Sequence, residues 1–414
     1  MTSLRRRHLL AAVSATLAAP SIAHAQQITL DFPSWQAEEP GIREWWRAVI
    51  AEFEQKNSSV KVNLFQIPFG QFINQMTTRF AGNNPPDIVH LPARNFPSFA
   101  AQGWLAPLDD KLKTTDVAAT WTPLRGEMIW ESKEQGVLMM GYGSVLYYNE
   151  KLLMDAGVAV PKTADEWLAA IEKITKRDQG LFGLAATSTE HPNLLVDVGT
   201  WITGQGLDWL EGGRYRFTEP KIVAAFEQYR RAMRFAPPAQ STEAARQIFA
   251  DGKAAFLRDG PWVYPLTQRA PETVRPHLKM ARVPFQFVSG GTSNSLHMAA
   301  STTGRKAELV WEFIKTAITP AMQEQFTVLT GSPAPRRDAL SAAQTERLPH
   351  LKLVNAAAAE ARNLFPIVPT VRENYNEFAR AIAQAAMRMQ SSDTPTATVL
   401  AELQRNLERQ IPLK

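Results

Sequence analysis

Several aromatic and hydrogen-bonding side chains of this chain stand directly after predicted strands. Trp35 and Gln36 follow a strand predicted over 27–32, and Arg94 follows another predicted over 87–91. Ligands of a parallel α/β sheet lie outside the carboxyl ends of its strands, so these side chains are candidates for a binding site. Sugars expose apolar C–H faces ringed by hydroxyl groups, and a flat aromatic surface with a few fixed donors and acceptors suits them. These residue types therefore favour the binding of a polyhydroxylated small molecule.

Catalytic motifs are absent where an enzyme would show them. The chain has no His-Glu-x-x-His, no Gly-x-Ser-x-Gly, no phosphate loop and no Gly-x-Gly-x-x-Gly. It has no cysteine, which excludes a thiolate nucleophile and a cysteine-zinc cluster, and its seven histidines are scattered. The sequence predicts a binding protein without catalytic residues, metal or cofactor. A glycoside hydrolase needs only two carboxylates, so an exported carbohydrate-active enzyme stays open as an alternative.

The elements that would position these residues alternate along the chain. Strands are predicted over 27–32, 60–65 and 87–91, with helices over 41–56 and 69–81 between them. This alternation predicts a parallel sheet with helices on its faces, which is the α/β class.

The segment 136–167 carries the most closely spaced signals. Residues 136–148 are rich in strand formers but contain Gly141 and Gly143, which indicates a bend or a close approach of backbones. A short helix over 150–156 then ends at a glycine. The next helix begins with the spacing Thr-x-x-Glu, at 163–166, which is typical of a capping box.

This order of elements resembles the crossover segment of bacterial extracellular solute-binding proteins, the maltose-binding type of ABC-importer receptor. In that family a strand ends in Tyr-Asn, a short helix closes in Ala-Gly, and a motif close to Pro-x-Thr-x-x-Glu-Trp follows. Tyr148-Asn149, Ala156-Gly157 and residues 161–167 match these features in order. Further matches stand at 86–89, 103–109, 247–262, 311–315 and 330–331, so the resemblance covers nearly all of residues 27–409.

The resemblance implies an α/β, two-domain, type II periplasmic-binding fold with a hinge between its lobes. The N-terminal lobe is expected to hold residues 26–141 plus 295–332, and the C-terminal lobe residues 142–294 plus 333–414. The first hinge is expected at Tyr142 to Ser144, where the glycines interrupt the strand.

The same resemblance implies a monomeric periplasmic protein that captures a sugar, oligosaccharide or polyol and delivers it to an ABC permease. Two alternatives stay open on the sequence: an anionic ligand, such as a sugar acid, a sulfonated sugar or a glycerol phosphate, and a receptor that feeds a sensor instead of a transporter.

The family motif and the positions near strand ends and crossings indicate the candidate ligand-binding residues. In the family the Trp of the Gly-x-Trp turn commonly faces the cleft, which points to Trp262 as the first aromatic contact. Arg336, and Arg337 beside it, follow Pro335 near an expected crossing and could pair with an anionic group. The full predicted set is Trp262, Trp35, Gln36, Arg94, Tyr142, Ser144, His191, Asn193, Gly291, Ser293 and Arg336, together with Thr292, which follows Gly291.

The first 25 residues read as an export signal. Three arginines at 5–7 precede a short apolar run, and Ala23-His24-Ala25 gives a cleavage pattern, so the mature chain is expected to begin near Gln26. Arg6-Arg7 also resembles the twin-arginine signal, and the general secretory route stays open beside it. Without this segment Lys+Arg falls from 45 to 42 against 40 Asp+Glu, and no basic cluster supports a nucleic-acid partner.

Overall fold

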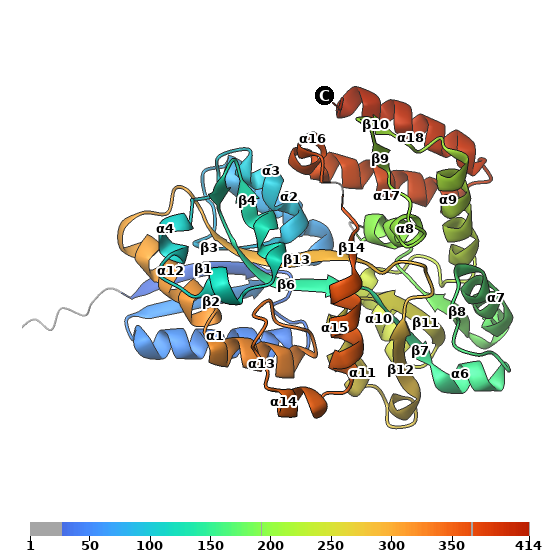
Figure 1. The fold of residues 1–414 in the computed structure, drawn as a ribbon, viewed down its shortest axis with the longest axis horizontal. Coiled ribbons are helices and arrows are strands. Elements are labelled where there is room, and N and C mark those ends of the chain that lie inside the picture. Colours follow the sequence, from blue (N-terminus) through green and yellow to red (C-terminus); the bar gives the residue numbers. More distant parts are fainter. Residues whose placement is uncertain (1–26, 192, 366, 414) are drawn as a thin grey trace, which may run out of the picture.

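The protein consists of two lobes that lie side by side, each with its own hydrophobic core (Figure 1). The computed structural model describes residues 27–191, 193–365 and 367–413, so the expected signal segment lies outside the described residues. One core gathers residues between Leu30 and Met140 with others between Leu296 and Phe326. The other gathers residues between Val145 and Val288 with others between Val354 and Ile411. Each lobe is thus built from separate stretches of the chain.

The first lobe follows the expected alternation, but its strands lie in more than one sheet and do not all pair in parallel. Strands β1 and β2 pair in parallel, whereas β3 pairs antiparallel with β13, which returns from the other lobe and also pairs antiparallel with β6. The prediction of a parallel sheet is therefore wrong for β3. The elements are β1 (Ile28–Ser34), α1 (Ile42–Lys56), β2 (Val60–Gln66), α2 (Phe69–Ala81), β3 (Ile88–Pro92), α3 (Phe96–Ala100), α4 (Asp109–Leu112), α5 (Val117–Thr120), β4 (Ile129–Trp130), β5 (Lys133–Glu134), β6 (Val137–Gly143), β13 (Ser289–Met298), α12 (Gly304–Ala317) and α13 (Pro320–Thr330).

The second lobe surrounds a four-stranded mixed sheet with the order β12, β7, β11, β8. Strand β11 runs parallel to β8 and antiparallel to β7. The elements are β7 (Val145–Asn149), α6 (Glu150–Asp155), α7 (Ala164–Ile174), β8 (Phe182–Ala185), α8 (Leu194–Thr203), β9 (Leu210–Glu211), β10 (Arg214–Tyr215), α9 (Pro220–Met233), α10 (Thr242–Ala250), β11 (Ala254–Asp259), α11 (Tyr264–Gln268), β12 (Leu278–Arg282), α15 (His350–Glu360), β14 (Arg362–Asn363), α16 (Pro369–Glu373), α17 (Tyr375–Ser391) and α18 (Thr396–Gln410). Helix α14 (Ala342–Glu346) lies in the segment that joins α13 to α15.

The expected cap at the start of α7 forms with one change. Thr163 Oγ1 accepts a hydrogen bond from the Glu166 backbone N–H at 3.2 Å, as a capping threonine does. The Glu166 carboxylate reaches back, but it accepts from the backbone N–H of Lys162 at 2.7 Å and not from that of Thr163. Both contacts satisfy backbone donors that the first helical turn leaves free.

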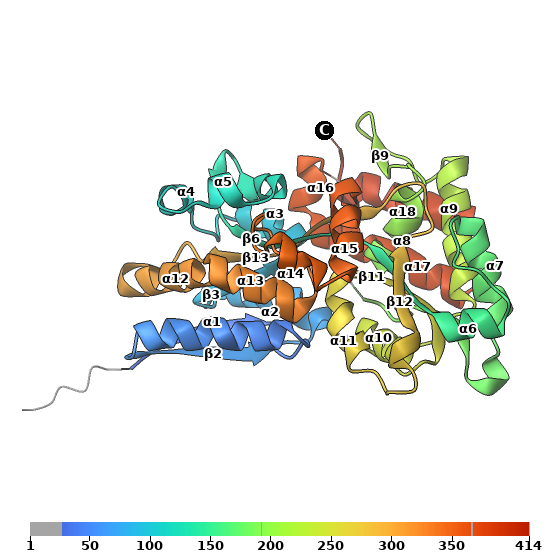
Figure 2. The same cartoon turned by 60° about the horizontal axis from the view of Figure 1, so that its bottom comes forward.

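The chain passes between the lobes at three places. Strand β6 of the first lobe runs into β7 of the second with only Ser144 between them, and β13 brings the chain back. The segment between α13 and α15 makes the third passage, and Figures 1 and 2 both place α15 between the lobes. The Ser144 backbone N–H donates to Ser289 O at 2.8 Å, which ties the first two passages together. Movement of the lobes about this junction stays a prediction.

Gly143, at the end of β6, is needed for close packing. A side-chain Cβ built on Gly143 would lie 2.1 Å from the carbonyl oxygen of Ala357, in the middle of α15. Helix α15 therefore rests directly on the backbone of the crossing strand. The sequence predicted either a bend or a close approach at this glycine, and the structure shows the close approach.

Replacement of Gly143 by alanine should destabilise the protein, because neither of the two backbones in contact can move aside at low cost. We expect Gly143→Ala to lower the free energy of unfolding by about 1–3 kcal/mol, the usual cost of overpacking. Urea unfolding followed by tryptophan fluorescence measures this change. Gly126→Ala is the matched control, because a Cβ at Gly126 would meet nothing within 4 Å. Equal urea midpoints for the two variants would contradict the packing argument.

Candidate functional site

A cavity of about 410 Å³ lies between the two lobes and receives residues from both of them and from the crossing strands. Its volume falls in the lower part of the range for small-molecule sites, roughly 300–1,000 Å³. From the first lobe it is lined by Trp35, Gln36, Glu38, Glu39, Phe69 and Arg94, from the crossing strands by Tyr142 and Ser293, and from the second lobe by Asn193, Asp197, Arg246, Arg258, Asp259 and Trp262, among others.

Aromatic rings stand on both sides of this cavity. Trp35, just beyond β1, stacks on His90 with ring centroids 4.2 Å apart, which fixes the plane of the indole. Trp262 packs against the cores of both lobes and meets Tyr142 edge to face at 4.9 Å. The Trp262 ring packs closely against Gly260, where an added Cβ would come within 2.2 Å of the indole. The absence of a side chain at Gly260 thus sets the position of Trp262.

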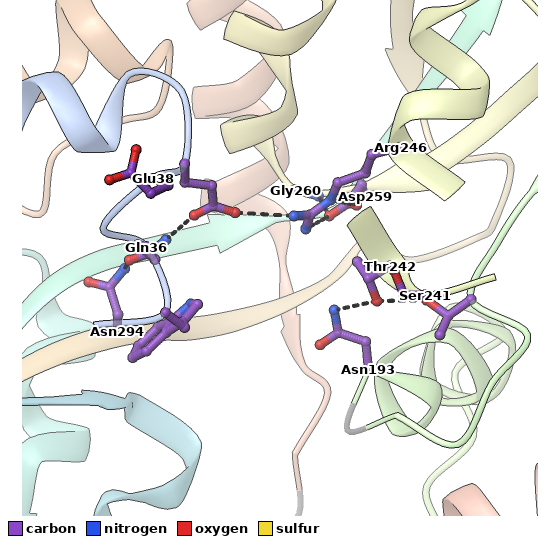
Figure 3. A network of polar contacts seen from close by, with 12 residues as sticks. Gln36, Glu38, Asn193, Ser241, Thr242, Arg246, Asp259, Gly260 and Asn294 are labelled. Carbon is purple, nitrogen blue, oxygen red and sulfur yellow. Dashed lines mark hydrogen bonds and ion pairs between the residues drawn. The ribbon is translucent and has the colours of Figure 1, made fainter. Parts of the chain in front are cut away.

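A continuous polar network links the lobes along one wall of the cavity (Figure 3). Asn294, on β13, donates to Gln36 Oε1 at 2.9 Å, and Gln36 Nε2 donates to Glu39 Oε2 at 2.7 Å. Arg246 of the second lobe donates to Glu39 Oε1 at 3.1 Å and, through Nε, to Asp259 Oδ2 at 2.8 Å. The network therefore runs from a crossing strand, through the first lobe, into the second.

The charged side chains of this network are largely buried. Burial raises the pKa of Glu39, and the Arg246 guanidinium opposes that rise. The Arg246 side chain is 13% exposed and that of Asp259 is 12% exposed, so the three charges interact through a medium of low polarity. Arg246 holds two carboxylates that would otherwise repel each other.

Two of the predicted residues meet across the cavity from opposite lobes. Arg94 Nη2 donates to Asn193 Oδ1 at 3.3 Å, and Asn193 Nδ2 donates to Thr242 Oγ1 at 3.2 Å. The guanidinium of Arg94 also lies over the rings of Phe69 and Phe365, 5.4 Å from each centroid. Such cation–π contacts hold the planar group in place.

Besides Thr292, four predicted residues are not among those that line the cavity. Ser144 is fully buried at the junction, and the Ser289 hydroxyl lies 3.5 Å from its own. His191 is buried behind the cavity and accepts from the Asn193 backbone N–H at 3.1 Å. Gly291 lies within β13 with a φ of 145°, and a Cβ built on it would lie 3.1 Å from Oδ1 of Asn363.

Arg336 is the fourth, and its charge is already paired. It donates to Asp116 at 2.8 Å and 3.1 Å and lies 2.9 Å from Asp338. The neighbouring Arg337 donates to the carbonyl of Ala119, and Thr292 donates to Glu127 at 2.9 Å. The expectation that Arg336 would meet an anionic ligand finds no support in this placement.

The charged residues of the second lobe were missed at the sequence level. Arg258 and Asp259 are the last two residues of β11, so the rule that ligands gather at strand ends would have found them. Asp197 and Arg246 lie on α8 and α10, where the sequence does not show which helical face meets the cavity.

Among the residues that the structure describes, no group of three or more histidine, cysteine, aspartate or glutamate side chains is arranged to hold a metal ion. In the same part of the chain no helix is both long enough and apolar enough to cross a membrane.

Two fully buried histidines of the first lobe make stability depend on pH. Burial lowers the pKa of His90 to about 3 and that of His297 to about 4. Because the unfolded histidines take up protons near pH 6.5 and the folded ones do not, stability falls as the pH drops from 6.5 toward 4. At pH 5 the loss should be roughly 2 kcal/mol for each histidine.

Urea unfolding at pH 7.5 and pH 5 measures this effect. His297→Gln, which keeps donors and acceptors for Ser295 and the Gln135 carbonyl, should lose about 2 kcal/mol less than the parent chain between the two pH values. His277→Gln, at a residue outside both cores, is the control and should keep the parental pH dependence. An unchanged dependence in His297→Gln would contradict the prediction.

Comparison with known proteins agrees with this architecture. The family model of the bacterial extracellular solute-binding proteins matches residues 37–324. The diacetylchitobiose-binding protein DasA of Streptomyces coelicolor is 25% identical over 389 residues, which span 88% of this chain and 87% of that protein. A galactooligosaccharide-binding protein of Bacillus subtilis is 25% identical over 61% of this chain and 62% of its own length.

Solved structures show the same fold. The solute-binding protein of Thermotoga lettingae with bound α-D-tagatose superposes with a TM-score of 0.81 at 20% identity, covering 92% of this chain and 99% of that one. The solute-binding protein of Agrobacterium radiobacter with bound ribitol has a TM-score of 0.81 at 20% identity, covering 92% and 98%. The chain, with its two-lobed type II binding-protein fold, belongs to the bacterial extracellular solute-binding proteins.

Proposed function

We propose that this protein captures a neutral sugar or polyol in the cavity between its lobes and delivers it to the permease of an ABC importer. The observation that carries the proposal is the presence of Trp35, from the first lobe, and Trp262, from the second, in the lining of one cavity together with fixed polar side chains. Aromatic faces suit the C–H surfaces of a sugar, and the polar groups suit its hydroxyls. Relatives named for oligosaccharides, and structures holding tagatose and ribitol, support the same ligand class.

The charges that line the cavity favour a neutral ligand over an anionic one. The acidic lining residues are Glu38, Glu39, Asp197, Glu243 and Asp259, and the basic ones are Arg94, Arg246 and Arg258. Arg246 and Arg258 each contact a carboxylate of this set. An anion would therefore enter a site whose positive charges are already outnumbered. The volume of about 410 Å³ suits a ligand of one or two sugar rings.

Capture would work by a shift of population between open and closed forms. A ligand that contacts Trp35 in the first lobe and Trp262 in the second gains both contacts only when the lobes are together, so it stabilises the closed form. The lobes would be residues 26–141 plus 295–332 and residues 142–294 plus 333–414. The two separate cores support this division. The permease would recognise the closed form.

Family membership indicates export. We place the mature protein in the periplasm as a monomer that begins near Gln26, and we assign it no cofactor and no catalytic activity.

A thermal-shift screen of the mature protein against neutral sugars, polyols, sugar acids and sugar phosphates tests the proposal. A ligand that binds only the folded state raises the melting temperature, by an amount that grows with its concentration above Kd. We expect stabilisation by neutral sugars or polyols, confirmed by calorimetric titration. Stabilisation by anionic compounds alone, or conversion of a stabilising sugar into products, would overturn the assignment.

A further inference from the structure

Part of the cavity reaches from the junction into the second lobe itself. Five of its lining residues come from four elements of that lobe and from the end of β11: Trp167, Leu184, Val196, Met233 and Leu257. All five belong to the core of the second lobe, and none is more than 8% exposed. These residues define what we call the second-lobe pocket. Its walls are apolar, which is unusual for a site that must hold only hydroxyl groups.

One ion pair lines the same cavity. Asp197, on α8, accepts through Oδ1 from Nη2 of Arg258, on β11. The Asp197 side chain is 16% exposed and that of Arg258 is 9% exposed, and because both line the cavity this exposure faces the ligand space. No described residue donates to Asp197 Oδ2, and none accepts from the other nitrogens of Arg258. The pair therefore offers an acceptor and donors side by side.

The two carboxylates that Arg246 binds are not open in this way, and Glu38 and Glu243, which also line the cavity, are exposed to solvent. Both Glu39 oxygens are used, one by Arg246 and one by Gln36. Both Asp259 oxygens accept from Arg246, and Oδ1 also accepts from the Gly260 backbone N–H at 2.7 Å. The network around Arg246 is thus complete without a ligand, and the Asp197–Arg258 pair is incomplete.

The pair lies between the junction and the interior of the second lobe. Burial is the main cause that raises the pKa of the Tyr142 hydroxyl at the junction and that of the Tyr229 hydroxyl on α9. At both hydroxyls the charge of Asp197 raises the pKa further and the charge of Arg258 lowers it. Burial also raises the pKa of Asp197 to about 6, against the opposing charge of Arg258. A carboxylate that is charged at neutral pH yet short of donors gains from any N–H that a ligand brings.

We propose that the second-lobe pocket takes an acetamido group carried by the sugar. The amide N–H of such a group would donate to Asp197 Oδ2, its carbonyl would accept from Arg258, and its methyl would lie against Leu184, Val196 or Met233. This assignment rests on the proposed function, since it names a substituent of the sugar held in the same cavity.

An acetamido group matches the acceptor on Asp197, the donors of Arg258 and the apolar walls of the pocket at once. Two neighbouring hydroxyls could satisfy the ion pair. They would bury no apolar group against the apolar walls, so these walls would add nothing to the affinity. A free amine would pair with Asp197 and meet the positive charge of Arg258. Only a group with a donor, an acceptor and a methyl fits every wall of the pocket.

Calorimetric titration of the mature protein with matched sugars tests the proposal. The pairs are D-glucose with N-acetyl-D-glucosamine, D-galactose with N-acetyl-D-galactosamine, and cellobiose with diacetylchitobiose. We expect the acetylated member of at least one pair to bind at least tenfold more tightly than its partner. Asp197→Asn, which keeps the size of the side chain, should reduce this ratio to below threefold. Ala186→Leu, which adds volume at a residue lining the same cavity, should reduce it as well.

Two further variants separate recognition from general damage. Asp259→Asn changes a carboxylate of the same cavity whose oxygens are already occupied, so it should alter the affinity for both members of a pair by the same factor. Asp110→Asn, at a side chain that is 94% exposed, should change nothing. Circular-dichroism melting of each variant verifies that it is folded.

The outcomes of this experiment distinguish the two proposals. If every pair binds within threefold, or if Asp197→Asn weakens both members equally, the acetamido assignment is overturned and the sugar-binding function stands. If no sugar or polyol of any kind binds, both are overturned.

Discussion

Arg246→Ala should weaken the binding of every ligand roughly 100-fold or more. The variant leaves Glu39 of the first lobe and Asp259 of the second facing one another without the guanidinium that contacts both of them. Removal of one partner from a buried charge network costs about 3–5 kcal/mol, because a buried charge is left uncompensated. Much of this cost falls on the closed form, in which Glu39 approaches the second lobe, so it appears as lost affinity.

Acid should restore part of the affinity of Arg246→Ala. Burial already raises the pKa of Glu39, and loss of Arg246 removes the interaction that opposes this rise. The closed form of the variant is therefore penalised above the pKa of Glu39 and relieved below it, so titration at pH 5 should give tighter binding than at pH 7.5.

Arg269→Ala provides the matched control for Arg246→Ala. Arg269 also pairs across the lobes, with Glu44 at 3.1 Å, but its side chain is 49% exposed. Exposed pairs contribute about 0–1 kcal/mol, so this variant should keep the parental affinity within about fivefold. If both variants bind alike, the interlobe network around Arg246 has no special part in closure.

Trp262→Ala should reduce affinity for the best ligand of the screen by about 2–4 kcal/mol, or roughly 30- to 1,000-fold, as is typical of an aromatic residue central to a binding site. The indole packs against the cores of both lobes, so its removal takes away a ligand face and a bridge between the lobes together. Calorimetric titration measures the effect.

Two companion variants show which of these roles dominates. Trp262→Phe keeps a ring and should lose no more than about tenfold. Gly260→Ala leaves the indole in the protein but drives it from its place, since the new Cβ would lie 2.2 Å from the ring. We expect an intermediate loss for this variant. A Kd for Trp262→Ala within threefold of the parental value would refute the assignment of Trp262 as a ligand contact.

The local signals of the sequence located most elements well. Helix α2 and strand β2 begin at the predicted residues, since their apolar periodicities are clear and their ends are marked by turn residues. Strand β13, which begins at Ser289, carries no such local signal. Its first residues are glycine-rich and have little intrinsic preference for a strand. These residues form a strand because they pair with β6, where Gly290 lies opposite Gly143.

Some residues of the site can be predicted from the local sequence, and others depend on contacts between distant parts of the chain. Trp35 and Arg94 follow strands directly, and the geometry of sheets alone directs them to the cavity. Arg336 stands just as close to a crossing, but Asp116, more than 200 residues earlier in the chain, holds it elsewhere. Asp197 and Arg246 lie on helices, and only the three-dimensional structure shows which face of each helix meets the cavity. Distances between residues far apart in sequence are what local patterns do not contain.

The course of β13 also dictates the order in which the molecule can be assembled during its synthesis. Met298 pairs with Ile88, and Gly290 pairs with Gly143, so the sheet of the first lobe stays incomplete until residue 298 has been made. Contacts between such distant segments form slowly, because a long loop must be closed first. A nascent chain that ends before Ser289 exposes the unpaired edges of β3 and β6, which other chains can join. We therefore expect the amino-terminal half alone not to form a complete first lobe.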